Sequence, residues 1–512
     1  MDYWIYLVTA LIIIYTTYYF CFRGLNYFKK HGIIHFKPKP MFGDMLPMIL
    51  GKESAGHIMQ RVYNLHSEAK YVGMFDFMTP IILLRDLELI KTIAIKQFDS
   101  FTDHRSFADE KLEPFVGSNL FSLRGDKWKE MRNLLSPAFT SSKLKGMFEL
   151  MSKCAADFAD YIANLPEDQK TMEMKNYFTR YTNDVIASCA FGITVDSMRN
   201  PNNEFYVNGK EVTDFTSKLQ IFKFFMNRSF PVASYYLGLK IIPTRIERFF
   251  TDVISNTVKV RDEQGIHRPD MIQLMMDARD KAGPGKQLNI TEMTTQAFIF
   301  FFGGFDTVSS AMCFAAHHIA VDPEIQSKVR AEVDAVLKEN NGQFTYDAVM
   351  KMEYLEAVIN EVLRLYPAGI FLDRVCVKEY ELPAALPGGK PLKVEKGSNI
   401  WIPVFPMHRD PNYFEDPSTF NPERFLEEGK SLANSPAFMP FGLGPRVCIG
   451  TRFSLMEMKI VLCHLLARCN FKTCAKTQIP LKVSTASFEM VAEGGYWLKL
   501  EVLKKVPASV VF

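Results

Sequence analysis

A decapeptide near the carboxyl end of the chain constrains the fold more than any other feature. Residues 441–450 read Phe-Gly-Leu-Gly-Pro-Arg-Val-Cys-Ile-Gly, and a helical hydrophobic pattern follows them. The glycines let the backbone turn sharply and approach a flat group without Cβ clashes. Arg446 offers a fixed fork of donors to a carboxylate. The segment therefore predicts a loop that presents one thiolate, from Cys448, to a metal with a single open side.

Zinc and nucleotide phosphates fit this chain less well. Most free cysteines are small buried hydrophobes, and we expect this for the other eight. The cysteines form no Cys-x-x-Cys pair and the chain has no His-Glu-x-x-His, so zinc is not indicated. Val447 occupies the last position that Gly-x-Gly-x-x-Gly requires, and Asp280 stands where a phosphate loop ending in Lys286 needs its first glycine. Neither a zinc site nor a nucleotide loop is predicted.

The decapeptide resembles the signature Phe-x-x-Gly-x-Arg-x-Cys-x-Gly of the cytochrome P-450 (haem-thiolate monooxygenase) family, and it matches every fixed position. The resemblance implies a mainly α fold with a smaller β-sheet region (α+β). It implies haem b (iron protoporphyrin IX) as cofactor, with Cys448 on the iron and Phe441 and Arg446 beside it. No linker, charge block or repeat divides residues 41–512, so we expect one catalytic domain there.

Local patterns place this motif among helices and short strands. Strand signals cluster at Met78–Leu84 and near Tyr380–Trp401. A helix is expected to begin at Cys448, which would place its positive end beside the sulfur. Asn289 and Glu292 have the spacing of a capping box, and a long helix is expected to run from there to about Ala320.

The middle of that long helix reads Gly303-Gly304-Phe305-Asp306-Thr307. Each glycine costs a helix about 1 kcal/mol relative to alanine, so we expect the helix to pass close to a flat ligand and to open locally. The motif resembles the family's oxygen-activating (Ala/Gly)-Gly-x-(Asp/Glu)-Thr, with Val308 where a second Thr or Ser is more usual. The resemblance implies that Thr307 donates a proton-carrying hydrogen bond and that Asp306 links this hydroxyl to solvent. A threonine bonded to its own i−4 carbonyl is the alternative.

Haem carries two propionate groups, which need cations or donors. Trp128 and Arg132 lie at i and i+4 on one predicted helix face and resemble the family's Trp-x-x-x-Arg haem clamp, although surface helices often contain such pairs. By their positions in matched segments, Arg374 and Arg446 are the other implied propionate partners.

A second charged motif points to folding rather than catalysis. Glu361 and Arg364 are spaced as an ordinary helical i,i+3 pair. They resemble the family's Glu-x-x-Arg, and the segment 422–425 resembles the one that supplies a third partner, Arg424. The implied network of Glu361, Arg364 and Arg424 is buried near the thiolate loop and serves folding and haem retention.

Three aromatic residues, Phe121, Phe302 and Phe371, are expected to line the substrate pocket, because they lie in segments matched to the open side of the haem. Ordinary core packing is an equal alternative for each. The chain is rich in phenylalanine, with 43 residues. An aromatic, largely uncharged pocket favours lipophilic substrates.

The amino-terminal segment predicts a membrane anchor. Residues 3–22 carry no formal charge, and a helix of this length spans about 30 Å. Basic residues follow it, so residues 1–22 are expected to form a single transmembrane helix that leaves the catalytic domain on the cytosolic side. A cleaved signal peptide would need a basic start and a shorter apolar core, and a buried soluble helix is the second alternative. Residues 23–40 are expected to be a basic, Pro-rich linker.

The resemblance implies a monooxygenase that inserts one atom of O2 into a lipophilic molecule, similar to microsomal, xenobiotic-metabolising insect members. No flavin or nicotinamide fingerprint is present in the sequence. Electrons are therefore expected from NADPH–cytochrome reductase on the endoplasmic reticulum membrane, with cytochrome b5 as a second candidate donor. The basic residues Lys127, Lys129, Arg132 and Arg452 either steer such an acidic partner or form a plain solvated face. The net charge of +3 is spread along the chain and gives no case for nucleic acid.

Three alternative functions remain open on the sequence alone. One is a hydroxylase of endogenous hormones or lipids with the same chemistry. Another is a haem-thiolate isomerase or dehydratase that acts on a peroxide without O2 or a reductase. The third is a haem sensor or a lipophile-sequestering protein without turnover. The Asp306-Thr307 pair argues against the last two, since neither needs proton delivery to oxygen.

Overall fold

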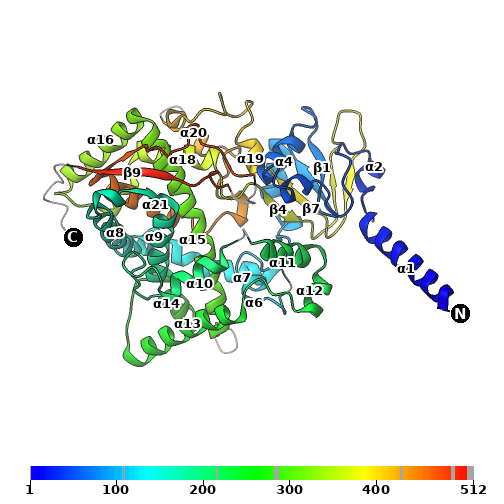
Figure 1. Ribbon diagram of the computed structural model, residues 1–512, viewed down its shortest axis with the longest axis horizontal. Helices are drawn as coiled ribbons and strands as arrows, with labels where there is room; N and C mark the ends of the chain where they lie inside the picture. Colours follow the sequence, from blue (N-terminus) through cyan, green and yellow to red (C-terminus); the bar gives the residue numbers. More distant parts are fainter. Residues whose placement is uncertain are drawn as a thin grey trace.

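The computed structural model describes residues 2–22, 24–106, 108, 110–214, 217–281, 288–426, 430–485 and 490–503. A large helical body stands beside a smaller region of sheet, and the first helix projects away from both (Figure 1). The prediction of a mainly α protein with a small sheet region is confirmed. The longer helices of the body are α7 (Gly125–Leu135), α8 (Ser141–Ala163), α9 (Met174–Ala190), α13 (Thr244–Gln264), α14 (Met271–Lys281), α15 (Ile290–Val321), α16 (Pro323–Glu339), α18 (Glu353–Leu365) and α21 (Thr451–Leu466).

Helix α15 runs through the centre of the helical body and packs against α9, α13, α18 and α21. Its start is the predicted capping box, in which Asn289 and Glu292 exchange side chain-to-backbone hydrogen bonds of 2.9 Å. It ends at Val321, and Pro323 then begins α16. The helix continues without interruption through its glycine pair, so the predicted local opening is wrong.

Gly303 and Gly304 lie in different surroundings. A Cβ on Gly304 would lie 2.6 Å from Cδ1 of Ile186, so this glycine allows α9 to pack closely on α15. A Cβ on Gly303 would meet nothing within 4 Å, so this glycine faces open space.

The main sheet has four strands in the order β1-β2-β7-β4. β1 and β2 form an antiparallel hairpin, β2 pairs in parallel with β7, and β7 pairs antiparallel with β4. Strand β2 lies at the first predicted strand region, and β5, β6 and β7 lie in the second. The bounds are β1 Tyr71–Asp76, β2 Thr79–Leu84, β3 Thr171–Glu173, β4 Leu372–Val375, β5 Tyr380–Leu382, β6 Leu392–Val394, β7 Asn399–Ile402, β8 Cys469–Lys472 and β9 Trp497–Val502.

Two hydrophobic cores correspond to these two regions. One fills the helical body, and the other lies between the main sheet and the short helices α2 (Tyr27–His31) and α4 (Ala55–Tyr63). Phe28 of α2 is fully buried, and a Cβ on Gly73 of β1 would collide with its ring. Part of the predicted 23–40 linker is therefore helical and packs on the sheet.

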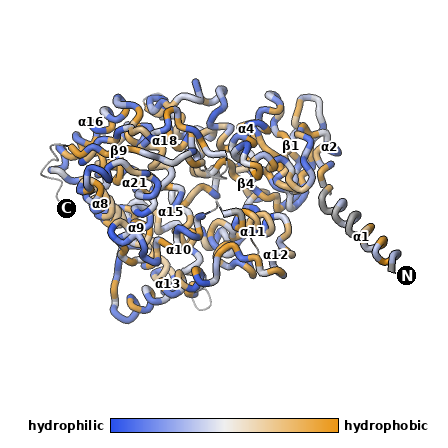
Figure 2. The backbone as a smooth tube through the Cα atoms, viewed as in Figure 1, coloured by the Kyte–Doolittle hydropathy of each residue, from blue (hydrophilic) through white to orange (hydrophobic). Residues whose placement is uncertain are grey.

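Helix α1 (Asp2–Phe22) carries exposed apolar side chains, such as Tyr3, which is 90% exposed. Figure 2 shows apolar stretches along it and along α11 (Lys218–Ser229) and α12 (Pro231–Leu237) at the surface. By length and composition alone, α15 is the described helix that could cross a membrane, and more than half of its apolar window is buried as in a core helix. The continuously described apolar stretch in α1 is shorter, Tyr3–Ile12, so membrane anchoring stays a prediction.

Candidate active site

The Cys448 loop is a tight turn held by backbone contacts. The backbone N–H of Cys448 donates to the carbonyl of Phe441 at 2.7 Å, which closes the loop. Gly442 and Gly444 have φ values of 95° and 74°, a region that glycine adopts without strain. A Cβ on Gly444 would also collide with the carbonyl oxygen of Ala94. The loop therefore depends on glycine for both its turn and its packing.

Cys448 is exposed, whereas most described side chains of α21 that follow it are buried. Helix α21 begins at Thr451 rather than at Cys448, because residues 449–450 form a turn first. Although solvent reaches Cys448, the protein atoms packed around the sulfur displace part of its hydration and raise the pKa of the thiol, while the backbone N–H of Gly450, Arg132 and the Thr451 hydroxyl lower it. These three groups are the ones that would stabilise a thiolate.

A second accessible surface lies on the central helix. Gly303 and Thr307 are one helical turn apart and exposed, although Phe301, Phe305 and Val308 around them are buried. The Thr307 hydroxyl donates to the carbonyl of Gly303 at 2.5 Å. This face of α15 is therefore open and polar at Thr307.

The side chains of Asp306 and Thr307, both in the described part of α15, are not hydrogen-bonded to each other. The carboxylate Oδ1 of Asp306 forms an ion pair with Nζ of Lys175, on α9, at 2.8 Å. The same ammonium contacts the hydroxyls of Ser309 and Ser310 at 2.8 and 2.7 Å. The predicted direct link from Thr307 through Asp306 to solvent is absent in this arrangement, because helical geometry turns Asp306 about 100° away from Thr307.

Arg374 and Arg446 are buried with few carboxylates beside them. Arg374 donates to the carbonyls of Asp373 at 2.8 Å and Leu443 at 3.1 Å, and its Nε has no partner within the described residues. Arg446 donates to the carbonyls of Thr102 and Leu123 at 2.8 Å, and its ion-pair contact to Asp103 is 3.7 Å long. Burial lowers the pKa of Arg374 to about 10 and that of Arg446 to about 9.

Trp128 and Arg132 of α7 lie beside this group. The Arg446 guanidinium stacks over the Trp128 ring, with 4.0 Å between its Cζ and the ring centroid. Burial lowers the pKa of the half-buried Arg132, and the Cys448 thiolate opposes this effect. Arg132 is thus within electrostatic reach of the sulfur.

These residues fit a flat, dianionic iron cofactor. An accessible sulfur lies on a loop whose glycines keep Cβ atoms away, and the central helix presents an open face at Gly303. The buried Arg374 guanidinium has an orphaned N–H and so has spare capacity for an anionic group, whereas Arg446 beside it already donates to four backbone carbonyls. The fit is to haem: Cys448 would hold the iron, and Arg374, Arg446, Trp128 and Arg132 would hold the propionate side, with Phe441 packed in the loop.

The structure brings the three residues of the predicted buried network together. Glu361 accepts two hydrogen bonds from Arg364, at 2.7 and 2.8 Å, and one from Arg424 at 3.1 Å. The side chains of Glu361 and Arg364 are fully buried, and Arg424 is 9% exposed. The backbone N–H of Asn421 fills a further acceptor position on Glu361 at 2.8 Å.

His408 connects this network to the thiolate loop, and sequence reasoning missed it. Its Nδ1 lies 3.2 Å from the carbonyl oxygen of Arg364, and its Nε2 accepts the backbone N–H of Met439 at 3.0 Å. Met439 stands two residues before Phe441, where the loop begins. Burial lowers the pKa of His408 to about 3, so the ring stays neutral and bridges the two segments. The residues around His408 form no local pattern that would reveal this role.

The predicted pocket aromatics lie on three different elements. Phe121 is 37% exposed and stacks on His104, with ring centroids 4.4 Å apart. Phe302 of α15 is half-buried. Phe371 precedes β4 and stacks on Trp401, with centroids 3.9 Å apart. The structure thus leaves all three at partly accessible positions.

Two more residues near the arginines were missed. His104 is buried and its Nδ1 lies 2.7 Å from Oδ1 of Asp373. Burial raises the pKa of Asp373, but His104, the Arg105 N–H and Arg374 outweigh burial and bring it to about 2. The signal in the sequence was Asp373 directly before Arg374, an acid beside a residue expected in a buried cationic site.

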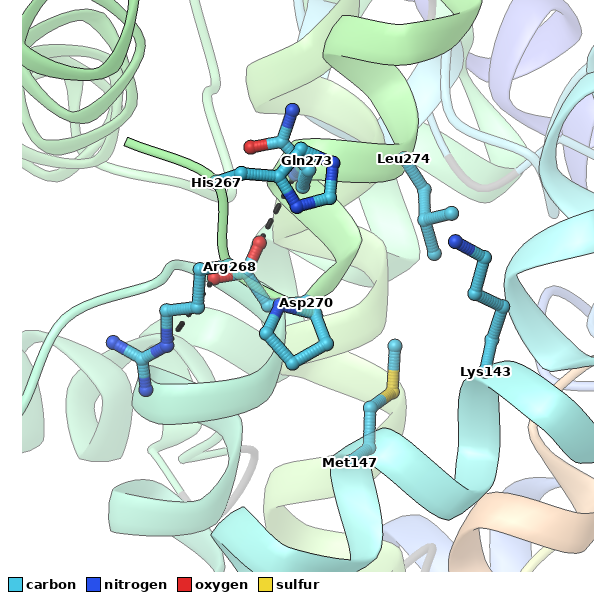
Figure 3. A pocket seen from close by; sticks show the side chains of 8 residues that line it. Lys143, Met147, His267, Arg268, Asp270, Gln273 and Leu274 are labelled. Atoms are coloured by element: carbon cyan, nitrogen blue, oxygen red, sulfur yellow. Dashed lines mark hydrogen bonds and ion pairs between the residues drawn. The ribbon is translucent and has the colours of Figure 1, made fainter. Parts of the chain in front are cut away.

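A small cleft lies elsewhere, between α8 and the connection from α13 to α14. Figure 3 shows Lys143 and Met147 of α8 on one side, and His267, Arg268 and Asp270 on the other. Its volume is about 40 Å³, far below the roughly 300–1,000 Å³ of typical ligand pockets. It is not the candidate site.

Fold and site together define a haem-thiolate protein. The family model Cytochrome P450 matches residues 35–498, and the chain belongs to the cytochrome P-450 family. It is similar to cytochrome P450 9e2 of Blattella germanica, with 42% identity over 97% of this chain and 98% of the relative. Probable cytochrome P450 9f2 of Drosophila melanogaster is 39% identical over 93% of this chain and 95% of the relative. Cytochrome P450 6j1 of Blattella germanica is 35% identical over 94% of this chain and 95% of the relative.

Membership establishes the general activity. The chain is a cytochrome P-450 monooxygenase with haem bound through a cysteine thiolate, and it acts on small molecules with O2 and electrons from a redox partner. The three relatives named above are insect proteins, as the sequence resemblance predicted.

Proposed function

We propose that the protein oxidises lipophilic xenobiotics, with Cys448 as the haem ligand and electrons supplied from NADPH by a membrane-bound reductase. The observation that carries the assignment of Cys448 is its exposed position on a glycine loop, with Arg132, Thr451 and the Gly450 N–H around the sulfur. When bound, the haem supplies one-electron redox chemistry and dioxygen activation, and a thiolate ligand favours cleavage of the O–O bond.

The protein's own residues supply orientation and protons. Arg374 and Arg446 would hold the propionate groups of the haem, and the open face at Gly303 would leave room for the reacting molecules. Thr307 Oγ1 donates its proton to the carbonyl of Gly303 in this structure, so donation on the open face requires the hydroxyl to rotate away from that carbonyl. Asp306 can exchange protons with solvent through the half-open cluster of Lys175, Ser309 and Ser310, since both Lys175 and Asp306 retain some exposure, 23% and 19%.

The lipophilic substrate class is supported by the partly accessible aromatic side chains of Phe121, Phe302 and Phe371. Aromatic, concave surfaces with few polar groups bind apolar ligands. The sequence resemblance to microsomal, xenobiotic-metabolising insect members of the family is the basis for proposing xenobiotics in particular. An endogenous hormone or lipid substrate is the alternative within the same chemistry.

An endoplasmic reticulum location, with the catalytic domain in the cytosol, is proposed from the amino-terminal helix. Every side chain of α1 that the structure describes is exposed, as expected of a helix whose apolar surface lies in lipid. Helices α11 and α12 add further exposed apolar groups, including Leu219, Phe222, Tyr236 and Leu237. The membrane would cover both surfaces.

NADPH–cytochrome reductase is the proposed electron donor, and cytochrome b5 is a candidate second donor. Lys127 and Lys129 on α7 and Arg452 on α21 are exposed on the two helices that flank the Cys448 loop. Exposed cations at this place would attract an acidic partner and raise its association rate.

Reconstitution tests the proposal. The full-length haem protein is combined with reductase and NADPH in vesicles and offered a panel of plant toxins, insecticides and terpenoids. The expected result is NADPH consumption coupled to oxygenated products of the foreign compounds. Turnover without NADPH would indicate an isomerase or dehydratase, binding without product would indicate a sequestering protein, and products from terpenoid hormones alone would indicate an endogenous role.

A further inference from the structure

The segment before helix α6 (Pro114–Gly117) carries a fully buried carboxyl group. Oε1 of Glu113 accepts hydrogen bonds from the backbone N–H groups of Ile241 and Ile242, in the connection from α12 to α13. Oε2 is buried and has no hydrogen-bond partner in the part of the chain that the structure describes. One carboxyl group therefore ties together two segments about 130 residues apart in the sequence, with half of its bonding capacity unused.

Both tied segments pack against the same place on α15. The Phe298 ring lies 5.1 Å from that of Phe115, in α6, and 5.4 Å from that of Phe250, in α13. Phe298 precedes Gly303 by five residues, a distance of about 7.5 Å along a helix. Elements α6 and α13 therefore meet the same residue of α15, within about two helical turns of Gly303 but on a different side of the helix.

The Glu113 segment also continues directly to the predicted pocket wall. The N–H of Leu120 donates to Oε1 of Gln296, on α15, at 2.8 Å, and Phe121 follows. On the other side, the carbonyl of Ile241 accepts from Gln220 at 3.1 Å, which holds the connection to α11. Glu113 thus joins two structures that are each anchored separately, and its bonds cross the boundary between them.

The charged groups that face Glu113 come from the connection and from α13. They are Lys240 and Glu247, which pair with each other at 2.5 Å. Since Lys240 is already bound to Glu247, the Glu113 carboxyl has no cation of its own among these described groups. Its ionised form is held by two N–H groups and by little else.

We propose that Glu113 is a positioning residue that acts as a proton-dependent clasp between the α12–α13 connection and the α6 segment, and that losing its proton loosens this edge of the pocket. Burial raises the pKa of Glu113 to about 7, although the two N–H donors and Lys240 oppose this. Because the pKa of Glu113 is raised when the α12–α13 connection is closed on it, the closed form binds the Glu113 proton more tightly than an open form in which the carboxyl has its ordinary pKa. Opening therefore becomes easier as the pH rises from the ordinary value toward 7, and by about tenfold between pH 6 and pH 8.

Amide hydrogen exchange tests the clasp on the full-length haem protein in detergent micelles. Protection factors for the amides of residues 239–242 are measured from pH 6 to pH 8 and corrected for the intrinsic pH dependence of exchange. We expect protection to fall about tenfold over this range in the wild type and to stay constant in Glu113→Gln, which keeps an acceptor oxygen but does not titrate. Asp184→Asn is the matched control: burial also raises the pKa of Asp184, to about 6, but this residue lies on α9 and bonds Ser197, so the pH dependence should persist.

Protection that is constant with pH in the wild type would overturn the proposal, even if Glu113→Gln fails to fold. A pH dependence retained in folded Glu113→Gln would overturn it as well. A second measurement rests on the proposed function, because it uses the pocket. The association rate of 4-phenylimidazole is followed by the Soret shift and divided by the concentration of neutral ligand, because the ligand's own imidazole titrates in this pH range. The corrected rate should rise with pH in the wild type and not in the variant. The exchange experiment needs neither substrate nor reductase, so its outcome is independent of the proposed activity.

Discussion

Replacing Glu361 with glutamine tests whether the buried network holds the fold around the thiolate loop. Glu361 is fully buried, and its two oxygens receive four hydrogen bonds, from Arg364, Arg424 and the Asn421 N–H. The substitution leaves Arg364, also fully buried, without its counter-ion, although three backbone carbonyls still accept from its other N–H groups. Removing one partner of a buried ion pair costs about 3–5 kcal/mol, and the remaining carbonyl contacts place our expectation at the lower end.

The assay is the lifetime of the thiolate-ligated haem in mild urea, followed through the red-shifted Soret band of the reduced carbon monoxide complex. A loss of about 3 kcal/mol from the unfolding barrier corresponds to an increase in rate of about 150-fold. The control is Asp347→Asn, which removes an exposed ion pair with Lys145 whose side chains are 65% and 60% exposed, and which should change the rate by less than about fivefold. A Glu361→Gln lifetime within about fivefold of the wild type would refute the reasoning.

Four further variants probe separate parts of the account. Thr307→Ala should preserve the fold, because the hydroxyl bonds to a carbonyl of its own helix, but divert NADPH electrons to hydrogen peroxide; unchanged coupling of NADPH to product contradicts the proton-donor role. Gly304→Ala should destabilise the protein by about 1–3 kcal/mol, and adding Ile186→Val, which removes the colliding Cδ1, should restore part of this; equal stability of single and double variants in urea contradicts the packing argument. Arg374→Met should release haem to apomyoglobin about tenfold faster or more, since one charge-assisted contact to a propionate is lost; an unchanged release rate removes Arg374 from the haem site. His408 has a pKa of about 3 in the folded protein, so as the pH falls the unfolded chain binds the proton first, and wild-type stability decreases below about pH 6.5. In His408→Gln the decrease in stability between pH 7 and pH 5.5 should be smaller by about 1 kcal/mol. An unchanged dependence of stability on pH contradicts the assignment.

Motifs that act through their own local geometry could be predicted from the sequence. The capping box at Asn289 and Glu292 marked the start of α15, because both partners lie within one helical turn. The strand signals near residues 78–84 and 380–401 were likewise local. The start of α21 was predicted three residues too early, because hydrophobic spacing does not reveal the turn at residues 449–450.

Contacts between distant elements could not be predicted in the same way. The ion pair of Asp306 with Lys175 joins residues 131 positions apart, and nothing beside Lys175 marks it as the partner of a motif residue. Its consequence, that Asp306 faces α9 instead of Thr307, therefore appeared only in the structure. The two adjacent glycines of α15 were also ambiguous in the sequence, where both were expected to bring the helix close to a flat ligand. The structure shows that Gly304 allows Ile186 of α9 to pack closely, whereas Gly303 faces open space.

The central claim is that the sulfur of Cys448 binds the haem iron, and the reduced carbon monoxide spectrum tests it most directly. The wild-type protein, expressed with ample haem, should show the strongly red-shifted Soret band of a thiolate-ligated complex, and Cys448→Ser should lose that band. Cys463→Ser, at a buried cysteine in the helix that follows the loop, should keep it. A wild-type spectrum typical of histidine ligation, or a red-shifted band that survives in Cys448→Ser, would contradict the account.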